Sequence, residues 1–224
     1  RAERTTPYAV WLAGFTALLA RLTGRGEFLV GVPVHNRLEA RWSRLVGSLV
    51  NTLPLRAAVA LARPFAEHLR ATAAEVAWGL DHQRVSFERL VERAAPTRDL
   101  SRTPLYSVMF TGEPPLEAGL SRAGRALTPV PLELGIAKVD LSVGVHEAQG
   151  HFVLEWEYGT ELFEAATIAR WHALLLQLLA AAVDGPGAAL ARLPFGSAED
   201  LALEAALNRP SAPAASATVV AGVL

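Results

Sequence analysis

The sequence predicts a mixed α/β (α+β) fold, a two-layer sandwich with helices packed on one face of a mixed, mainly antiparallel sheet. Of its 224 residues, 51% are hydrophobic and 19% are charged, so it can bury a sizeable core as one large domain or two small ones. Helix and strand patterns are mixed along the chain and do not alternate in strict βαβ order. The last two strand patterns, 139–145 and 152–158, join through the turn 147–150 into a hairpin.

The helices are predicted from apolar residues at three- and four-residue spacing and from residues that begin or end helices. In the first helix, Thr6 is the expected N-cap, Pro7 takes the first helical position and Gly24 follows the last turn. Ser86 is expected to cap the third helix in the same way. The expected helices cover residues 7–23, 64–81, 87–95, 165–183 and 198–207.

The remaining strands are predicted from short apolar runs. The segment 28–56 is expected to form a strand, a loop and a second strand. Its first strand should lie inside the sheet and end at Pro33, which has no N–H for a ladder. A further buried strand is expected at 105–110, followed by a long loop, 111–127, of the kind that is usually functional or mobile.

Polar residues cluster where these two apolar runs are interrupted. His35, Asn36 and Arg37 stand at the mouth of the first strand, and Asn51 and Thr52 interrupt the second run. The two clusters are therefore candidates to line one cavity.

A structural role is the alternative for these residues. Asn36 and Asn51 would then hydrogen-bond to turn backbone, and Arg37 would pair with Glu39 at the surface. On residue types alone, both interpretations stay open.

Other polar residues have equally simple structural explanations. Asp140 faces away from the apolar side of its strand, so it either pairs with a cation such as Lys138 or Arg37, or lines a cavity. His82 lies in the break between two helices, where polar residues most often cap backbone groups. His68 and His172 are expected to be partly buried structural residues of helices.

Composition and motifs exclude several function classes. A formal net charge of −1 gives no electrostatic reason to expect nucleic acid or an anionic membrane as a partner. The chain has no cysteine, which fits a cytoplasmic location, and its longest apolar runs are shorter than the roughly 20 residues of a membrane span. No P-loop, G-x-S-x-G or Rossmann fingerprint occurs, and we expect no catalytic and no metal-binding residue in this chain.

Five stretches of the chain carry distinctive combinations of residues. Residues 30–37 contain G-x-P-V-x-x-R, 47–56 contain G-x-x-V-N-T-x-x-x-R, 82–88 contain H-Q-x-x-x-F-E, 98–105 contain R-D-x-S-x-x-P-L and 108–110 are V-M-F. In these motifs and in their order, the chain resembles the C-terminal half of a nonribosomal peptide synthetase condensation domain. The resemblance covers nearly the whole chain.

The resemblance implies a chloramphenicol-acetyltransferase-like lobe, half of a V-shaped pair whose interface forms a tunnel. In that tunnel, the amine of an acceptor amino acid attacks a donor thioester and gives an amide. The lobe itself binds no cofactor, because both substrates are carried on phosphopantetheine arms. The implied partners are the N-terminal lobe of the same domain, donor and acceptor peptidyl carrier proteins and a following adenylation domain.

The resemblance also implies roles for the polar residues. The acceptor side of the tunnel is expected to include His35, Asn36, Asn51 and Thr52. Its wall is expected to be held by Arg37, Asp140 and His82, with an internal ion pair between Arg37 and Asp140.

One departure from the family concerns catalysis. The family's H-H-x-x-x-D-G motif belongs to the N-terminal half, and no two histidines are adjacent in this chain, so we expect the chain to be inactive alone.

Residues 1–207 are expected to form the lobe, and 208–224 a linker and the start of an adenylation domain. Two other functions stay open: a non-catalytic docking module for carrier proteins and the adenylation domain, or half of an epimerisation-type or stand-alone acyltransferase relative.

Overall fold

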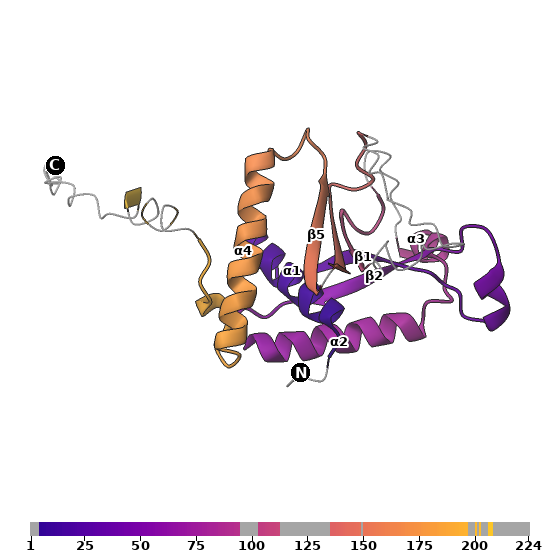
Figure 1. The fold of residues 1–224 in the computed structure, drawn as a ribbon, viewed down its shortest axis with the longest axis horizontal. Coiled ribbons are helices and arrows are strands. Elements are labelled where there is room, and N and C mark those ends of the chain that lie inside the picture. The colour runs from indigo at the N-terminus through magenta and orange to yellow at the C-terminus, as the bar shows by residue number, and fades with distance from the viewer. Residues whose placement is uncertain are drawn as a thin grey trace, which may run out of the picture.

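The computed structural model describes residues 5–94, 103–112, 135–148 and 150–196, with positions 200, 202, 206 and 207. Its elements, in chain order, are α1 (Pro7–Thr23), β1 (Glu27–Val34), the 3-10 helix η1 (Ala40–Arg44), β2 (Asn51–Ala58), α2 (Phe65–Asp81), α3 (Phe87–Ala94), β3 (Val108–Gly112), β4 (Leu141–Ala148), β5 (His151–Tyr158), α4 (Ala165–Asp184) and the 3-10 helix η3 (Leu190–Arg192) (Figure 1). This order confirms the expected succession of helices and strands. Most of the predicted helix 198–207, the loop beyond residue 112 and the tail 208–224 lie outside the described residues.

The strands form one five-stranded mixed sheet in the order β2-β1-β3-β4-β5. The outer pairs β1/β2 and β4/β5 are antiparallel, whereas β3 runs parallel to both of its neighbours. β1 is an interior strand, as predicted, but it continues one residue beyond Pro33. Pro33 is tolerated there because β1 pairs with β3 only at Gly31, before the proline.

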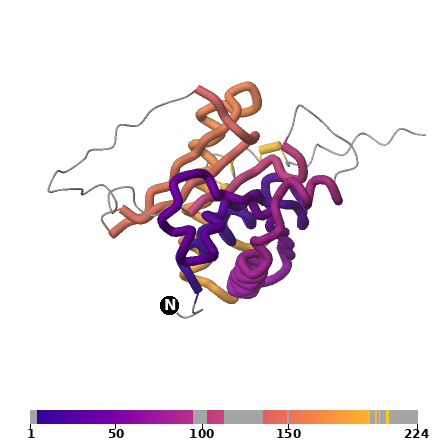
Figure 2. Tube along the Cα trace, turned by 90° about the vertical axis from the view of Figure 1, so that its right-hand side faces the viewer, coloured from indigo at the N-terminus to yellow at the C-terminus, as the bar shows by residue number. Residues whose placement is uncertain are grey.

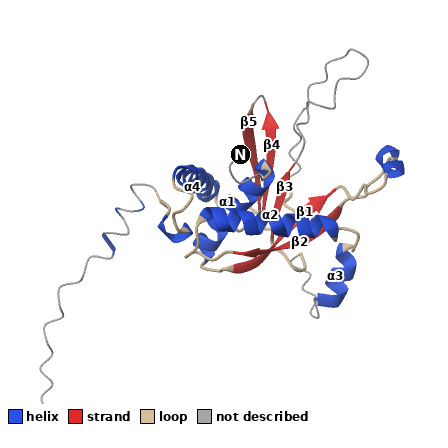
Figure 3. Ribbon diagram, turned by 90° about the horizontal axis from the view of Figure 1, so that it is seen from below, coloured by secondary structure: helices blue, strands red, loops and turns tan. Residues whose placement is uncertain are grey.

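The helices pack on one face of this sheet. Figure 3 shows α1 and α2 lying across one side of the strands, and Figure 2 shows α2 nearly end-on below them. Alternate strand residues on that face, such as Val30, Phe110 and Val143, are at most 1% exposed and share one core with α1, α2 and α4. The predicted two-layer arrangement is therefore confirmed.

Helix α1 is the central element of the helical layer. The hydroxyl of its N-cap Thr6 accepts a hydrogen bond from the N–H of Ala9 at 3.2 Å, and Gly24 ends the helix with a left-handed φ of 70°. Between these caps, Phe15 and Leu18 have no exposed surface. The capping residues predicted from the sequence therefore set both ends of the most buried helix.

Helix α4 is longer than the apolar run that predicted it. With 20 residues and a mean hydropathy of 1.4 in its most apolar window, it is long and apolar enough to cross a membrane. Counting only the uninterrupted run 173–183 missed this, because Arg170 and His172 divide the helix. In the fold, Leu175 and Leu178 are fully buried against the core, as expected of a core helix.

Two strand boundaries differ from the prediction. Strand β3 begins at Val108 and not at 105, because Leu105 has a left-handed φ of 72° that no extended strand contains. The hairpin is also tighter than expected, since Ala148 pairs with His151 and leaves only positions 149 and 150 between the strands. Gly150 has a φ of 82°, which suits a two-residue hairpin connection.

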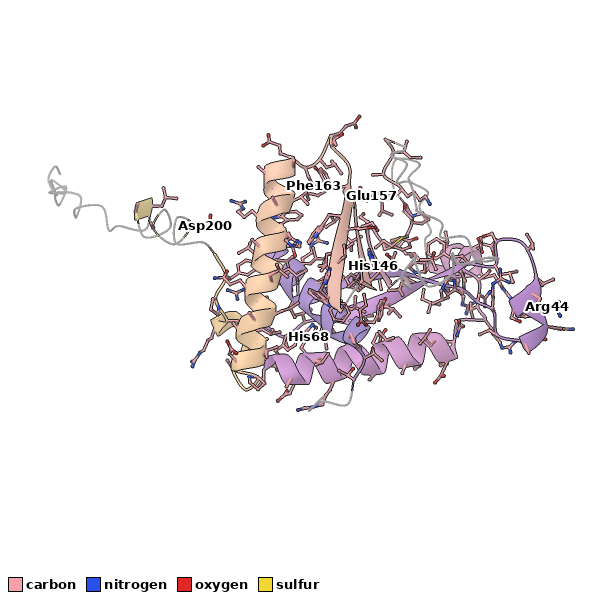
Figure 4. The ribbon with its side chains drawn as sticks, viewed as in Figure 1. Arg44, His68, His146, Glu157, Phe163 and Asp200 are labelled. Atoms are coloured by element: carbon pink, nitrogen blue, oxygen red, sulfur yellow. The ribbon has the colours of Figure 1, made fainter. Side chains whose placement is uncertain are left out.

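His68 joins α2 to α1 inside the core (Figure 4). It is 5% exposed, and its Nε2 lies 2.9 Å from Thr16 Oγ1 and 3.2 Å from the carbonyl oxygen of Ala13. Burial lowers the pKa of His68, and the hydrogen bond to Ala13 offsets part of this effect. His68 is therefore a structural residue that is stable in its neutral form, as the sequence predicted.

The carboxamide of Asn51 joins the start of β2 to the turn between α2 and α3. Its Nδ2 donates to the carbonyl oxygens of Gln83 at 3.0 Å and Val85 at 2.8 Å, and its Oδ1 accepts from the N–H of Phe87 at 3.1 Å. That N–H belongs to the first residue of α3 and has no partner within the helix. We call this set of three bonds the Asn51 clamp.

The neighbouring Thr52 forms a second connection, to Tyr106, on the opposite face of the sheet. Its hydroxyl is hydrogen-bonded to that of Tyr106, whose ring covers the position where a Cβ of Gly31 would lie. Burial raises the pKa of the Tyr106 hydroxyl, and the bond to Thr52 offsets part of the shift. A glycine is required at position 31, because a Cβ there would come within 2.5 Å of the Tyr106 ring.

His68 predicts a specific dependence of stability on pH. Because the pKa of His68 is lower in the folded than in the unfolded chain, its contribution is complete above the unfolded pKa of about 6.5 and is lost as the pH falls. The loss can reach about 1.4 kcal/mol per pH unit for one proton. In urea titrations from pH 7 to pH 5, His68→Gln should show a smaller fall in the free energy of unfolding than wild type. His151→Gln controls for the loss of a surface histidine, and equal slopes for H68Q and wild type would contradict this assignment.

The Asn51 clamp predicts that Asn51→Asp destabilises the fold at neutral pH. The variant should regain part of its lost stability at acidic pH. A carboxylate has the shape of the carboxamide but would place an oxygen against two carbonyl oxygens, at a cost of at least about 3 kcal/mol. Protonation restores one donor, so thermal melts should show the deficit of N51D relative to wild type shrinking from pH 7 to pH 5. Asn51→Ala should have a deficit that does not shrink in the same way. An N51D variant as stable as wild type at pH 7 would rule out the clamp.

Candidate functional site

The candidate site is an open cleft of about 420 Å³ between the ends of β1 and β2 and the second half of α2. Its apolar lining comes from two strands and one helix, with Tyr8 and Gly112 at one side. The side chains concerned are Val32, Val34, Leu53, Leu55, Val76 and Leu80. A second cleft, between α1, α2 and β2, has only about 120 Å³ and is too small for more than a few water molecules.

His35 and Asn36 border this cleft at the mouth of β1. Asn36 has a left-handed φ of 50°, which asparagine tolerates better than most residues, and this conformation turns the chain away from the sheet. The structure therefore brings these two predicted residues together beside a cavity. Gln83, from the turn after α2, adds a third polar group to the lining.

Arg37 also borders the cleft, but its guanidinium is bound to the loop that follows. Its Nη1 donates to the carbonyl oxygens of Trp42 at 2.5 Å and Leu45 at 3.0 Å, and its Nη2 to that of Gly47 at 3.1 Å. Figure 1 shows this loop, with η1, reaching away from the sheet, and Figure 4 places Arg44 at its far end. Arg37 thus holds a projecting loop in shape.

Both ion pairs considered for Arg37 are wrong. Glu39 pairs with Arg41 at 2.7 Å, so it does not neutralise Arg37. Asp140 is half-buried, and none of the ion pairs formed within the described ranges involves it. Its carbonyl oxygen instead accepts from the N–H of Gly159 at 3.1 Å, beside the end of the hairpin. The predicted internal Arg37–Asp140 pair fails because the three loop carbonyls provide closer acceptors for the guanidinium.

Asn51 and Thr52 do not belong to the cleft lining. The Asn51 clamp uses the carboxamide for backbone groups of the α2–α3 turn, and Thr52 points to Tyr106 on the other face. The expectation that both side chains border the same cavity as His35 is corrected, because alternation along β2 places the two on opposite faces. The structural alternative, in which Asn51 satisfies turn backbone, is the one that the geometry supports.

His82 closes the C-terminal end of α2, next to Gln83. Its Nδ1 lies 2.7 Å from the carbonyl oxygen of Trp78, and its ring stacks on that of Trp78 with a centroid distance of 4.2 Å. The side chain is exposed. His82 therefore caps the end of α2, as its place in the sequence suggested, and it is not among the residues that line the cleft.

Three residues of the site were not singled out from the sequence. Val76 and Leu80 belong to the apolar spacing that predicts the helix 64–81, but the helix extends past the core and exposes its last turns to the cleft. Tyr8 belongs in the same way to the apolar spacing of α1. Its hydroxyl lies 3.5 Å from the carbonyl oxygen of Phe110, and burial raises its pKa. The only sequence signal for Tyr8, Val76 and Leu80 was the spacing of apolar residues, and this spacing does not distinguish a core residue from one in the wall of a cleft.

The chemistry of the cleft is that of a surface that positions a ligand. In the part of the chain that the structure describes, no three His, Asp or Glu side chains lie close enough to hold a metal ion. The polar groups at its mouth can donate and accept hydrogen bonds, and its walls are apolar. Arrangements of this kind can orient a ligand.

The sequence is similar to parts of longer known proteins. Phosphinothricin tripeptide synthetase PhsB from Streptomyces viridochromogenes is 39% identical over 200 residues, which is 86% of this chain and 16% of that protein. Surfactin synthase subunit 1 from Bacillus subtilis is 34% identical over 189 residues, or 84% of this chain and 5% of that protein. The chain therefore spans only a small part of the length of these relatives.

Solved structures show the same fold. A four-domain nonribosomal peptide synthetase, holo-AB3403, superposes with a TM-score of 0.78 at 23% identity, over 87% of this chain and 16% of that one. The condensation domain of the monacolin K polyketide synthase MokA gives 0.70 at 24% identity, over 85% of this chain and 44% of that one. The X-domain from teicoplanin biosynthesis gives 0.75 at 20% identity, over 87% and 45%. The sequence model of the family described as "Condensation domain" matches residues 1–201, and the chain belongs to this family.

Proposed function

We propose that this chain is the C-terminal, acceptor-side lobe of a condensation domain in a nonribosomal peptide synthetase. Its match to the condensation family over residues 1–201 carries the proposal. Two further facts support the assignment to one lobe: the chain spans 44% of the MokA condensation domain, and none of its six histidines is adjacent to another. The five stretches that resemble motifs of the family's second half, 30–37, 47–56, 82–88, 98–105 and 108–110, follow one another in the family's order.

In this function, the domain joins a donor acyl or peptidyl thioester to the amine of an acceptor amino acid. The amine nitrogen attacks the thioester carbonyl carbon, the carbon–sulfur bond breaks, and the carrier thiol leaves. The proton lost by the amine is handled by the other lobe, and this lobe contributes position. His35 and Asn36 can hydrogen-bond to the acceptor's amine or carbonyl at the cleft mouth, which holds the reacting atoms in line.

The proposed partners follow from the same function. They are the N-terminal lobe of the domain, the donor and acceptor peptidyl carrier proteins with their phosphopantetheine arms, and a following adenylation domain, all in the cytoplasm. The arms are parts of the substrates, so the lobe needs no cofactor of its own. A non-catalytic docking module is the second candidate, favoured by the lack of any adjacent histidine pair.

The proposal predicts that this chain forms no amide by itself. Single-turnover mixtures of a loaded donor carrier, a loaded acceptor carrier and the 224-residue chain should give no product by mass spectrometry, because no proton-transfer pair is present. The complete domain that contains this chain should give product under the same conditions. Product from the chain alone would refute the division of labour, and none from the complete domain would favour the docking module.

A second prediction separates the side chain of Asn36 from its backbone. Asn36→Gly keeps the left-handed conformation without steric cost but removes the carboxamide, whereas Asn36→Ala also strains the backbone. In the complete domain, N36G should keep the melting temperature of wild type and slow amide formation about tenfold, as the loss of one positioned hydrogen bond would. N36A should lower both. A wild-type rate for N36G would remove Asn36 from the site.

A further inference from the structure

The side chains that β1, β2 and α2 place along the walls of the cleft are apolar. Val32, Leu53 and Leu55 form one side and are each about 5–6% exposed, while Val76 and Leu80 of α2 form the other. Burying an aliphatic or aromatic group here removes apolar surface from water on both partners. The cleft therefore favours a ligand group that is itself apolar.

The lack of available charge in the described lining also favours an uncharged ligand group. Within the described residues that line it, no carboxylate is present, and the only residue with a permanent charge is Arg37. The Arg37 guanidinium already donates to three carbonyl oxygens of the following loop and faces that loop. A charged side chain entering the cleft would lose hydration and find no counter-charge, which is costly.

The volume of the cleft and the polar groups at its mouth indicate the size and the polar end of the ligand. About 420 Å³ lies within the range of roughly 300–1,000 Å³ found for small-molecule pockets. His35 and Asn36 after β1 and Gln83 after α2 provide hydrogen-bonding side chains, and the Tyr8 hydroxyl lies near the carbonyl oxygen of Phe110. A ligand with one apolar end and one peptide-like polar end fits this distribution.

We propose that the cleft is a specificity subsite for the uncharged aliphatic or aromatic side chain of a carrier-bound aminoacyl substrate. The inference rests on the proposed function and adds the substrate class that the lobe selects. The side chain occupies the space between β1, β2 and α2, and the amide or amine of the substrate stays at the His35–Asn36 rim. Both the donor and the acceptor can provide such a group, so the test must distinguish them.

Binding of unreactive probes tests the subsite without requiring turnover. The probes are pantetheine derivatives in which an amide replaces the thioester, carrying leucine or glutamate, each with a free amine as in an acceptor or an acetylated amine as in a donor. Titration calorimetry with the 224-residue chain should show leucyl probes binding at least about tenfold more tightly than glutamyl probes. A preference confined to the free-amine pair assigns the subsite to the acceptor, as the proposed function requires, and one confined to the acetylated pair would assign it to the donor and contradict the acceptor-side role of the lobe.

Matched variants of α2 locate the binding in the cleft. Val76→Phe fills the space and should abolish the preference for leucine, whereas Ala77→Phe adds the same ring to the exposed side of the same helix and should not. Leu80→Lys, at a 43% exposed position that tolerates a polar residue, should shift the preference toward the glutamyl probe. Equal binding of leucyl and glutamyl probes, or equal effects of V76F and A77F, would overturn the inference. A complete domain that forms no amide would instead refute the proposed function and leave these binding results standing.

Discussion

The Asn51 clamp is the interaction on which the candidate site depends. A single carboxamide provides two donors and one acceptor to three backbone groups that lie 32, 34 and 36 residues further along the chain. Asn51 is 9% exposed, so its own carboxamide is poorly solvated and needs these three partners. The clamp joins the start of β2 to the turn that ends α2, and the cleft lies between these two elements.

Close approaches of backbone complete the frame around the cleft. Gly79 lets α2 come down onto Leu55, since a Cβ there would lie within 2.5 Å of the leucine side chain. On the opposite face, Gly31 admits the ring of Tyr106, which Thr52 holds by its hydroxyl. Charge has little part in this frame, because Arg37 braces a projecting loop. A lobe built in this way can orient a substrate through shape and hydrogen bonds, which is what the proposed function asks of it.

The fold was predictable because its signals are local. Thr6, Pro7 and Gly24 set the ends of α1 through bonds within one or two turns, and alternation of apolar residues places the terminal hairpin. Strand β3 was misplaced because the left-handed backbone of Leu105 has no signature in its residue type. The site was predictable only in part. His35 and Asn36 lie at the cleft, as the end of an apolar strand suggested, but the partners of Asn51 and Arg37 depend on chain segments that only the folded structure brings together.

Asn51 holds the α2–α3 turn, and amide hydrogen exchange tests this clamp most directly. The N–H of Phe87 is the first of α3 and would exchange at the rate of an open helix end if nothing accepted it. With the Asn51 Oδ1 at 3.1 Å, it should exchange in the wild-type chain as slowly as the amides of β2, measured residue by residue by NMR. A Phe87 amide that exchanges as fast as an unprotected peptide would contradict the clamp and return Asn51 to the list of residues free to bind substrate.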